Sequence, residues 1–189
     1  MSEIKLKCSC GKVRGKTKNV NESSGTRIMC CCDDCQSFAQ YLNQESSVLD
    51  QYGGTDIFQM PISGVNITEG IEQVSSVRLS ATGMYRWYTK CCNTPIGNTM
   101  GPGGPFIGVI HNFMGDYSAR DEALGMNRGH IQTKFARQEV PSDLEGSSLK
   151  IIFRSLSKLI VWKLKGLNKP SVFFDDNGQP TSTPTILNQ

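Results

Sequence analysis

Apolar and polar residues alternate in short runs over the first two thirds of the chain, and glycine, proline, asparagine or serine separates the runs. This pattern is typical of β-strands joined by turns. Glu3–Lys18 is interrupted by two cysteines and a glycine, which predicts a hairpin of two strands. Further strands are predicted at Thr26–Cys30, Thr55–Met60, Gln73–Leu79, Met84–Thr89 and Phe106–His111. We therefore expect a mainly β, antiparallel fold.

Two segments have the three- and four-residue spacing of helices. The first is Asp34–Leu42, which directly follows a strand and a run of cysteines. The second is an amphipathic helix over residues 147–166, whose apolar positions are Leu149, Ile152, Phe153, Leu156, Leu159, Ile160 and Leu164. We expect this apolar face to pack on the sheet and the basic face to remain in solvent, because lysine stems commonly line such faces. The alternative is that the helix contacts a membrane surface or an acidic partner.

The ends and the composition of the chain complete this picture. Asn177–Thr185 is predicted to be an irregular arm, and Gly101–Pro105 a turn. The length of 189 residues and the lack of a clear linker predict a single domain, 1–189. With 20 Lys and Arg against 17 Asp and Glu, the net charge of +3 is too small to indicate a nucleic acid or an anionic membrane as partner. Met1–Leu6 lacks the features of a secretory signal, so we expect a cytoplasmic protein.

Eight cysteines in a cytoplasmic protein would be kept reduced, which favours metal ligands or reactive thiols over disulfides. They fall into three sequence clusters: Cys8-x-Cys10, Cys30-x-Cys32-x-x-Cys35 with Cys31 between, and Cys91-Cys92. Thiolates are preferred zinc ligands, and three from one turn leave a fourth position open, as in catalytic zinc sites. The sequence therefore predicts a catalytic zinc at Cys30, Cys32 and Cys35. Alternation along an extended segment places Cys31 on the other side.

The remaining cysteines, Cys8, Cys10, Cys91 and Cys92, are enough for a closed structural zinc site that ties the first hairpin to a distant strand. Redox sensing by the Cys30–Cys35 thiols is a further possibility. Asp34 and His111 are candidates for a proton donor beside the catalytic ion. These residues also have purely structural interpretations: Asp33 or Asp34 caps the following helix, and His111 is an ordinary histidine at a strand end.

The order and spacing of the cysteines resemble those of the glutathione-dependent formaldehyde-activating (GFA) enzyme family. The matching motifs are Cys-x-Cys-Gly at 8–11, Cys-x-Cys-x-x-Cys-Gln at 30–36 and Cys-Asn-Thr-Pro at 92–95. The resemblance covers about residues 3–113 and does not include the C-terminal helix. In the family the structural site closes with Cys-x-x-Cys, whereas here Thr89 stands three positions before Cys92. Either Cys91 takes that place or the site lacks one ligand.

This resemblance implies an Mss4-like antiparallel β-fold with one structural and one catalytic zinc ion. It assigns Cys8, Cys10 and Cys92 to the first ion and Cys30, Cys32 and Cys35 to the second. The implied activity is that of a carbon–sulfur lyase, which adds a small thiol such as glutathione reversibly to a small aldehyde. The alternative is a zinc-stabilised module without catalytic activity that binds a protein or a nucleic acid, with the basic helix as its contact surface.

Overall fold

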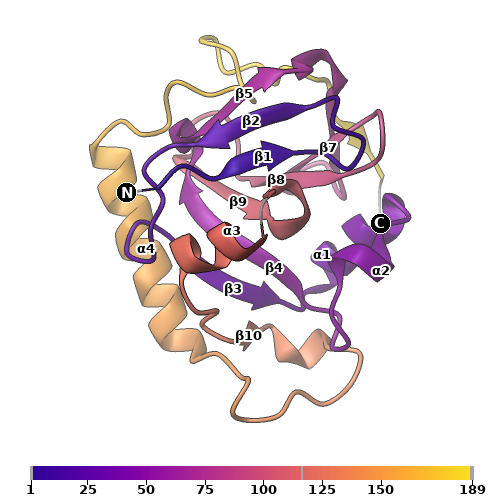
Figure 1. The fold of residues 1–189 in the computed structure, drawn as a ribbon, viewed down its shortest axis with the longest axis vertical. Helices are drawn as coiled ribbons and strands as arrows, with labels where there is room; N and C mark the ends of the chain where they lie inside the picture. Colours follow the sequence, from indigo (N-terminus) through magenta and orange to yellow (C-terminus); the bar gives the residue numbers. More distant parts are fainter. Residues whose placement is uncertain (1, 116, 188–189) are drawn as a thin grey trace.

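The computed structural model describes residues 2–115 and 117–187. Its centre is a sheet with the strand order β10-β3-β4-β9-β8-β7-β6-β11, and a three-stranded sheet of order β1-β2-β5 faces it (Figure 1). The strands are β1 (Lys5–Lys7), β2 (Arg14–Thr17), β3 (Thr26–Cys30), β4 (Thr55–Pro61), β5 (Val65–Glu69), β6 (Val74–Arg78), β7 (Tyr85–Thr89), β8 (Pro95–Thr99), β9 (Phe106–Ile110), β10 (His130–Ile131) and β11 (Thr185–Ile186). The two outermost strands of the large sheet, β10 and β11, pair parallel to their neighbours, and the other pairs are antiparallel.

Helices and short 3₁₀ turns connect and cover these strands. The α-helices are α1 (Asp33–Tyr41), α2 (Glu45–Val48), α3 (Tyr117–Leu124) and α4 (Ser148–Leu164). The 3₁₀ turns are Ile62–Gly64, Ile71–Gln73, His111–Phe113 and Thr133–Phe135. The expectation of a mainly β fold with a C-terminal helix is thus confirmed.

The large sheet buries apolar side chains on both of its faces. On one face Trp87 and Ile107 pack against Leu6 and Ile67 of the small sheet. On the other face α1 contributes Phe38 to a second cluster, which includes side chains of β3, β4 and β9 as well. Because successive side chains of a strand point to opposite faces, β4 and β9 supply both clusters. The cysteine turns follow β3 and β7 of the large sheet and β1 of the small sheet.

The strands predicted from alternation are present within one or two residues of the expected bounds, including the β1–β2 hairpin. β8 was not predicted, because Pro95, Gly97 and Asn98 are poor strand formers. It lies between β7 and β9, where a Cβ at Gly97 would come within 2.5 Å of the carbonyl oxygen of Gly108. The glycine therefore allows the two strands to approach. The turn expected at Gly101–Pro105 is also present, closed by a hydrogen bond from the Gly104 N–H to the Gly101 carbonyl.

The C-terminal arm is irregular up to residue 184, as predicted, but its end is fixed to the sheet. Thr185 and Ile186 form β11, which pairs with Val77 and Arg78 of β6. The Ser76 hydroxyl also donates to the Ser182 carbonyl at 2.9 Å. The prediction that Thr185 belongs to the irregular arm is therefore wrong.

The long helix α4 lies along one side of the molecule, at the left of Figure 1. The face of the helix that contacts the protein is not the one expected. Only Ile151 and Trp162 are buried, and most of the predicted apolar face is exposed to solvent. The side facing the protein carries polar groups that find partners there: Arg154 donates to the Gly25 carbonyl and Ser155 to Gln59. The prediction that the apolar stripe packs on the sheet is therefore wrong.

The orientation of α4 predicts unequal effects for two neighbouring isoleucines. Ile151 is 6% exposed and Ile152 is 53% exposed. Ile151→Ala should lower the free energy of unfolding by about 2 kcal/mol or more, whereas Ile152→Ala should change it by less than about 0.5 kcal/mol. Urea denaturation of both variants measures this difference. The opposite ranking would show that the apolar stripe faces the sheet.

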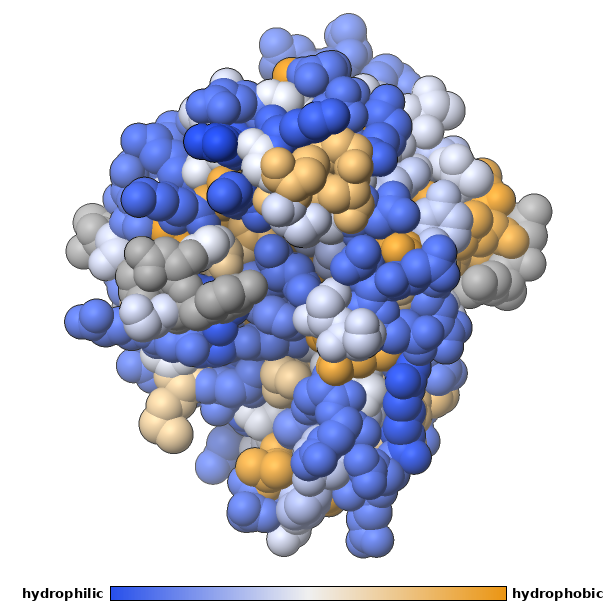
Figure 2. Space-filling model, turned by 45° about the vertical axis from the view of Figure 1, so that its right-hand side comes forward, coloured by the Kyte–Doolittle hydropathy of each residue, from blue (hydrophilic) through white to orange (hydrophobic). Residues whose placement is uncertain are grey.

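Polar residues dominate the face of the molecule shown in Figure 2, where apolar residues form small separate patches. Within the described part of the chain, no helix combines the length and the apolar character needed to cross a bilayer.

Candidate metal centres

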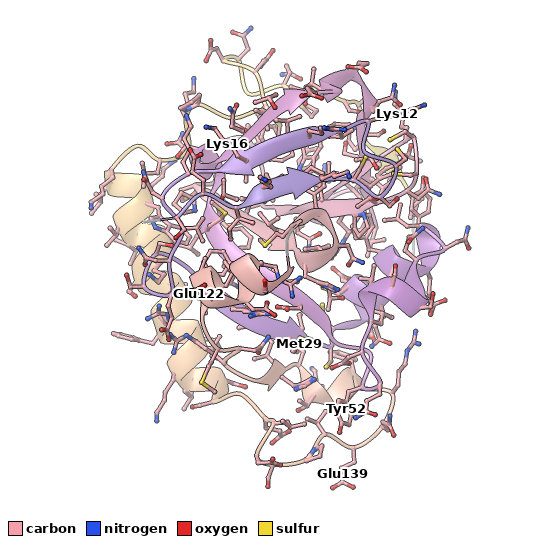
Figure 3. All side chains as sticks on the ribbon, in the orientation of Figure 1. Lys12, Lys16, Met29, Tyr52, Glu122 and Glu139 are labelled. Carbon is pink, nitrogen blue, oxygen red and sulfur yellow. The ribbon has the colours of Figure 1, made fainter. Side chains whose placement is uncertain are left out.

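Two turns from different sheets bring four cysteines together. Cys8 and Cys10 lie in the turn between β1 and β2, and Cys91 and Cys92 lie in the turn between β7 and β8. We call them the four-cysteine group. Sulfur atoms gather beside Lys12 at this end of the β1–β2 hairpin (Figure 3). The group therefore connects the small sheet to the large one.

The sulfur positions of the four-cysteine group fit one tetrahedral ion. Thiolates at about 2.3 Å from a tetrahedral zinc lie about 3.8 Å apart. All four sulfurs lie within 4.8 Å of one another, and all four cysteines are free. The closest Sγ–Sγ distances are 3.6 Å for Cys8–Cys10, 3.9 Å for Cys8–Cys91, 3.3 Å for Cys10–Cys91 and 3.7 Å for Cys91–Cys92. The sulfurs of the adjacent residues Cys91 and Cys92 can therefore both bind the same ion.

The sharp turn needed for this is visible in the backbone. Asn93 adopts a left-handed conformation with φ of 53°, and its N–H donates to the Thr89 carbonyl at 2.8 Å. Thr89 and Thr94 also place their hydroxyl oxygens 3.4 and 3.2 Å from the Cys92 sulfur. Thr89, the residue that departs from the GFA pattern, therefore contacts a cysteine of the group through its hydroxyl.

Polar groups around Cys92 favour its thiolate form. Burial raises the pKa of Cys92, but the hydroxyls of Ser9, Thr89 and Thr94 outweigh burial and lower this pKa to about 5. Burial and the neighbouring thiols of Cys10 and Cys92 raise the pKa of Cys91 to about 12. Thiolates so close together repel one another, and a divalent cation is what would allow all four to ionise.

The second group consists of Cys30, Cys32 and Cys35, and we call it the three-cysteine group. Cys30 is the last residue of β3, Cys32 is the N-cap of α1, and Cys35 lies in the first turn of that helix. Their sulfurs lie within 4.8 Å of one another, with 3.4 Å between those of Cys30 and Cys32. The predicted strand, cysteine turn and helix are thus confirmed.

No fourth donor from the described chain joins this group: no other histidine, cysteine, aspartate or glutamate there places a ligand atom within 4.8 Å of all three sulfurs. Cys31 is fully buried and belongs to neither group, as alternation predicted. A metal ion held by the three-cysteine group would therefore have a fourth position open to water or a ligand.

Charge within the three-cysteine group concentrates on Cys32. Hydrogen bonds from the Cys30 and Cys35 thiols, with a smaller contribution from the positive charge of Arg86, lower the pKa of Cys32 to about 3 against the effect of burial. The hydrogen bond to Cys32 raises the pKa of Cys30 to about 12. The hydrogen bonds with Cys30 and Cys32, together with burial, raise the pKa of Cys35 well above its usual value.

Arg86 is a residue of this site that the sequence did not indicate. It lies on β7 and its side chain is only 3% exposed. Its guanidinium donates to the Asp34 carboxylate at 2.8 Å and to Asn98 at 3.3 Å. A buried arginine held by two partners supplies a fixed positive charge beside Cys32. Its position in a strand between Tyr85 and Trp87 gave no motif by which to find it.

Asp34 lies beside the three-cysteine group, but it does not cap the helix. The N-cap of α1 is Cys32, and Asp33 and Asp34 follow in the first turn. The prediction that one of these aspartates is the N-cap is therefore wrong, because the helical backbone already begins at Asp33. Both acidic groups still lie at the positive end of the helix dipole. The Asp34 carboxylate accepts a hydrogen bond from Arg86 and pairs with it.

His111 begins the 3₁₀ turn that follows β9 and is not a member of either cysteine group. Burial lowers its pKa, and the charges that act on it come from Asp56 and Arg120. The structure therefore places His111 next to a cluster of ion pairs around Asp56, in which Arg27 donates to that carboxylate at 2.7 Å.

Two tyrosines pack near the three-cysteine group. Tyr88 contacts the apolar cluster that contains Cys30 and Cys35. The rings of Tyr41 and Tyr88 meet edge to face with their centroids 6.0 Å apart. Tyr85 and Trp87 lie on the other face of β7 and stack there, which confirms that they serve packing.

A family model matches residues 1–183, almost the whole chain, and its description is a family of unknown function, DUF6151. The chain belongs to the DUF6151 family. No curated protein matches this DUF6151 chain. Among solved structures it is similar to a Rhodobacter sphaeroides protein from a structural genomics programme, with 16% identity and a TM-score of 0.46 over 66% of this chain and 97% of the other.

Proposed function

We propose that this protein is a zinc enzyme that adds a small thiol, such as glutathione, reversibly to a small aldehyde. The three-cysteine group is its reaction centre. The observation that carries the proposal is the set of three convergent sulfurs that no fourth donor from the described residues completes. The resemblance of the cysteine motifs to those of the GFA family supports the same activity and an Mss4-like fold.

The donor sets favour soft metals, zinc among them, over magnesium and calcium. Both groups offer only sulfur, and soft thiolate ligands select zinc, copper(I) or iron–sulfur clusters rather than magnesium or calcium. The sulfur–sulfur distances in the four-cysteine group are close to the edges of a tetrahedral zinc site. We assign a structural zinc to this closed group and a catalytic zinc to the open one.

The reaction forms one bond between sulfur and the aldehyde carbon, and the proton of the thiol is transferred to the former carbonyl oxygen. A zinc ion with three cysteine ligands would bind the substrate thiol as a thiolate at its fourth position. The chain itself supplies charge balance, because Arg86 places a positive charge beside Cys32. Asp34 and Asn98 hold that guanidinium in place.

Contacts of the candidate residues support a different choice of proton donor. Asp34 accepts from Arg86, and the surroundings of His111 are set by Asp56 and Arg120. The hydroxyls of Tyr41 and Tyr88 are donors at the same end of the molecule, and burial together with Tyr88 raises the pKa of Tyr41. We therefore assign the transfer to solvent water or a tyrosine hydroxyl in preference to the two residues predicted from the sequence.

Two measurements test this function. In cobalt-substituted protein, glutathione should change the thiolate-to-cobalt absorption bands, since it would enter the open position. With ¹³C-formaldehyde and glutathione, magnetisation-transfer NMR should show faster exchange between free aldehyde and thiol adduct when the protein is present. Cys31→Ala is the matched control and should retain both effects. Unchanged cobalt bands together with the uncatalysed exchange rate would contradict the proposal.

The alternative, a zinc-stabilised binding module without catalytic activity, has one observation in its favour, namely the exposed apolar face of α4. A nucleic acid is poorly suited to that face, because the exposed stripe is apolar and two of the basic side chains, Arg154 and Lys158, bind backbone carbonyls of the 22–25 segment. Such a module would keep both metal ions and fail both tests of the enzyme.

A further inference from the structure

Helix α4 presents an apolar stripe to solvent over its whole length. The stripe consists of Leu149, Ile152, Phe153, Leu156, Ile160 and Leu164, which are between 53% and 82% exposed. Seventeen helical residues extend about 25 Å. In Figure 3 side chains of α4 project away from the sheets. Contiguous exposed apolar surface on this scale marks an interaction site.

A groove beside the stripe enlarges this apolar surface. It has a volume of about 610 Å³ and lies between α4 and the glycine- and proline-rich turn that follows β8. Its walls include Leu159 and Ile160 of the helix and Met100, Pro102 and Pro105 of the turn. The stripe and the groove together offer room for aliphatic chains.

The segment of sequence that contains α4 is strongly basic. Between Glu145 and Asp175 the chain has no acidic residue and six basic ones, which are Lys150, Arg154, Lys158, Lys163, Lys165 and Lys169. These six exceed the net charge of the whole protein, +3, so the rest of the chain is net negative. The small total charge therefore conceals a concentrated cationic segment, and the complementary partner is an anion.

A second hollow, on the other flank of α4, collects lysines. It measures about 350 Å³, and its lining includes Lys18, Lys158, Lys165 and Ser63. A cluster of lysines of this kind suits a phosphate group. The helix thus has an apolar groove on one side and a cationic, polar hollow on the other.

From this arrangement we infer that α4 docks the protein onto a membrane surface that contains anionic phospholipids. The apolar stripe enters the boundary between headgroups and acyl chains, and the flanking lysines contact the phosphates. The helix lies in the interface and does not cross the bilayer. The total charge of the chain argued against an anionic membrane, whereas contact of this helix with a membrane surface was the alternative interpretation of its amphipathic pattern.

A second copy of the chain fits this surface less well. In an antiparallel pairing of two α4 helices along the stripe, the positions near the two helix ends oppose each other. Lys150 of one copy would then face Lys163 of the other, and no acidic residue of the helix is available to compensate. An anionic lipid surface satisfies both the apolar and the cationic parts of the helix.

Vesicle flotation with the intact, metal-loaded protein tests the inference. Binding is expected to vesicles of phosphatidylcholine mixed with phosphatidylglycerol, to weaken with added salt, and to be at least about tenfold weaker to phosphatidylcholine alone. No binding to the anionic vesicles would overturn the inference. Equal binding to both kinds of vesicle would overturn its electrostatic part and with it the choice of partner.

Matched variants locate the surface. Phe153→Ser should weaken binding to the anionic vesicles about tenfold or more, whereas Phe135→Ser, outside α4, should not change it. Lys150→Gln with Lys165→Gln should weaken it about tenfold, and Lys5→Gln with Lys12→Gln should have little effect. All six positions in these two comparisons are at the surface, so unchanged melting temperatures verify folding. If Phe153→Ser leaves vesicle binding intact but converts a dimer into a monomer in sedimentation, α4 is a self-association face and the inference is wrong.

Discussion

Replacing Cys10 by alanine is expected to remove one zinc ion and to lower the free energy of unfolding by about 4 kcal/mol, which corresponds to about 10 °C or more in Tm. Cys10 is exposed, so the substitution removes almost no packing. Its partner Cys91 is 81 positions away in the sequence. A metal clip that closes so long a loop stabilises the folded state strongly, because it restricts the unfolded chain.

Lys12→Ala is the control for this prediction, since Lys12 is exposed in the same turn and contributes no sulfur. Calorimetry of both variants should show a large shift for Cys10→Ala alone. A strong chelator should bring the Tm of the wild-type protein down to that of Cys10→Ala. Equal melting temperatures for the wild type and Cys10→Ala, with and without chelator, would mean that the four-cysteine group carries no structural ion.

Cys32→Ala is expected to show the opposite behaviour: loss of the other zinc ion and of more than about 100-fold in thiol–aldehyde exchange rate, with a shift of only a few degrees in Tm. Loss of a residue that hydrogen-bonds to a metal ligand already lowers metal affinity or activity about 10- to 100-fold, and Cys32 would be a ligand itself. Stability should change little, because the three cysteines lie within one turn and an ion there closes no long loop.

Cys31→Ala is again the natural control, because Cys31 is adjacent, buried and outside the group. It should lose a little stability through the missing sulfur and should retain both metal ions and full activity. If Cys32→Ala keeps its second zinc ion, or if Cys31→Ala loses one, the assignment of ligands is wrong.

Much of the fold and both cysteine groups followed from the sequence. Strand alternation located β3, β4, β7 and β9, because each packs at least one face in a core. The spacing of Cys30, Cys32 and Cys35 indicated convergence, since a strand that runs directly into a helix brings such residues to one point. Spacing alone could not decide whether Cys91 and Cys92 act together, which depends on the left-handed turn at Asn93.

The features that escaped prediction depend on contacts between distant segments. Arg86 approaches Cys32 only because β7 and α1 meet across the second core, and no local pattern reports that contact. Periodicity identified α4 correctly but not which of its faces is buried. Arg154 and Ser155 have polar partners on the protein, so the less apolar face turned inward. A periodic pattern measures amphipathicity and does not identify the surface that covers it.

The most direct test of the two-centre account is zinc analysis combined with zinc X-ray absorption spectroscopy on protein purified without chelators. We predict two zinc ions per chain, with an average of between three and four sulfur ligands for each ion. The Cys32→Ala variant should contain one zinc ion, with four sulfur ligands. A protein without zinc, or one in which both ions have four sulfur ligands, would contradict the account.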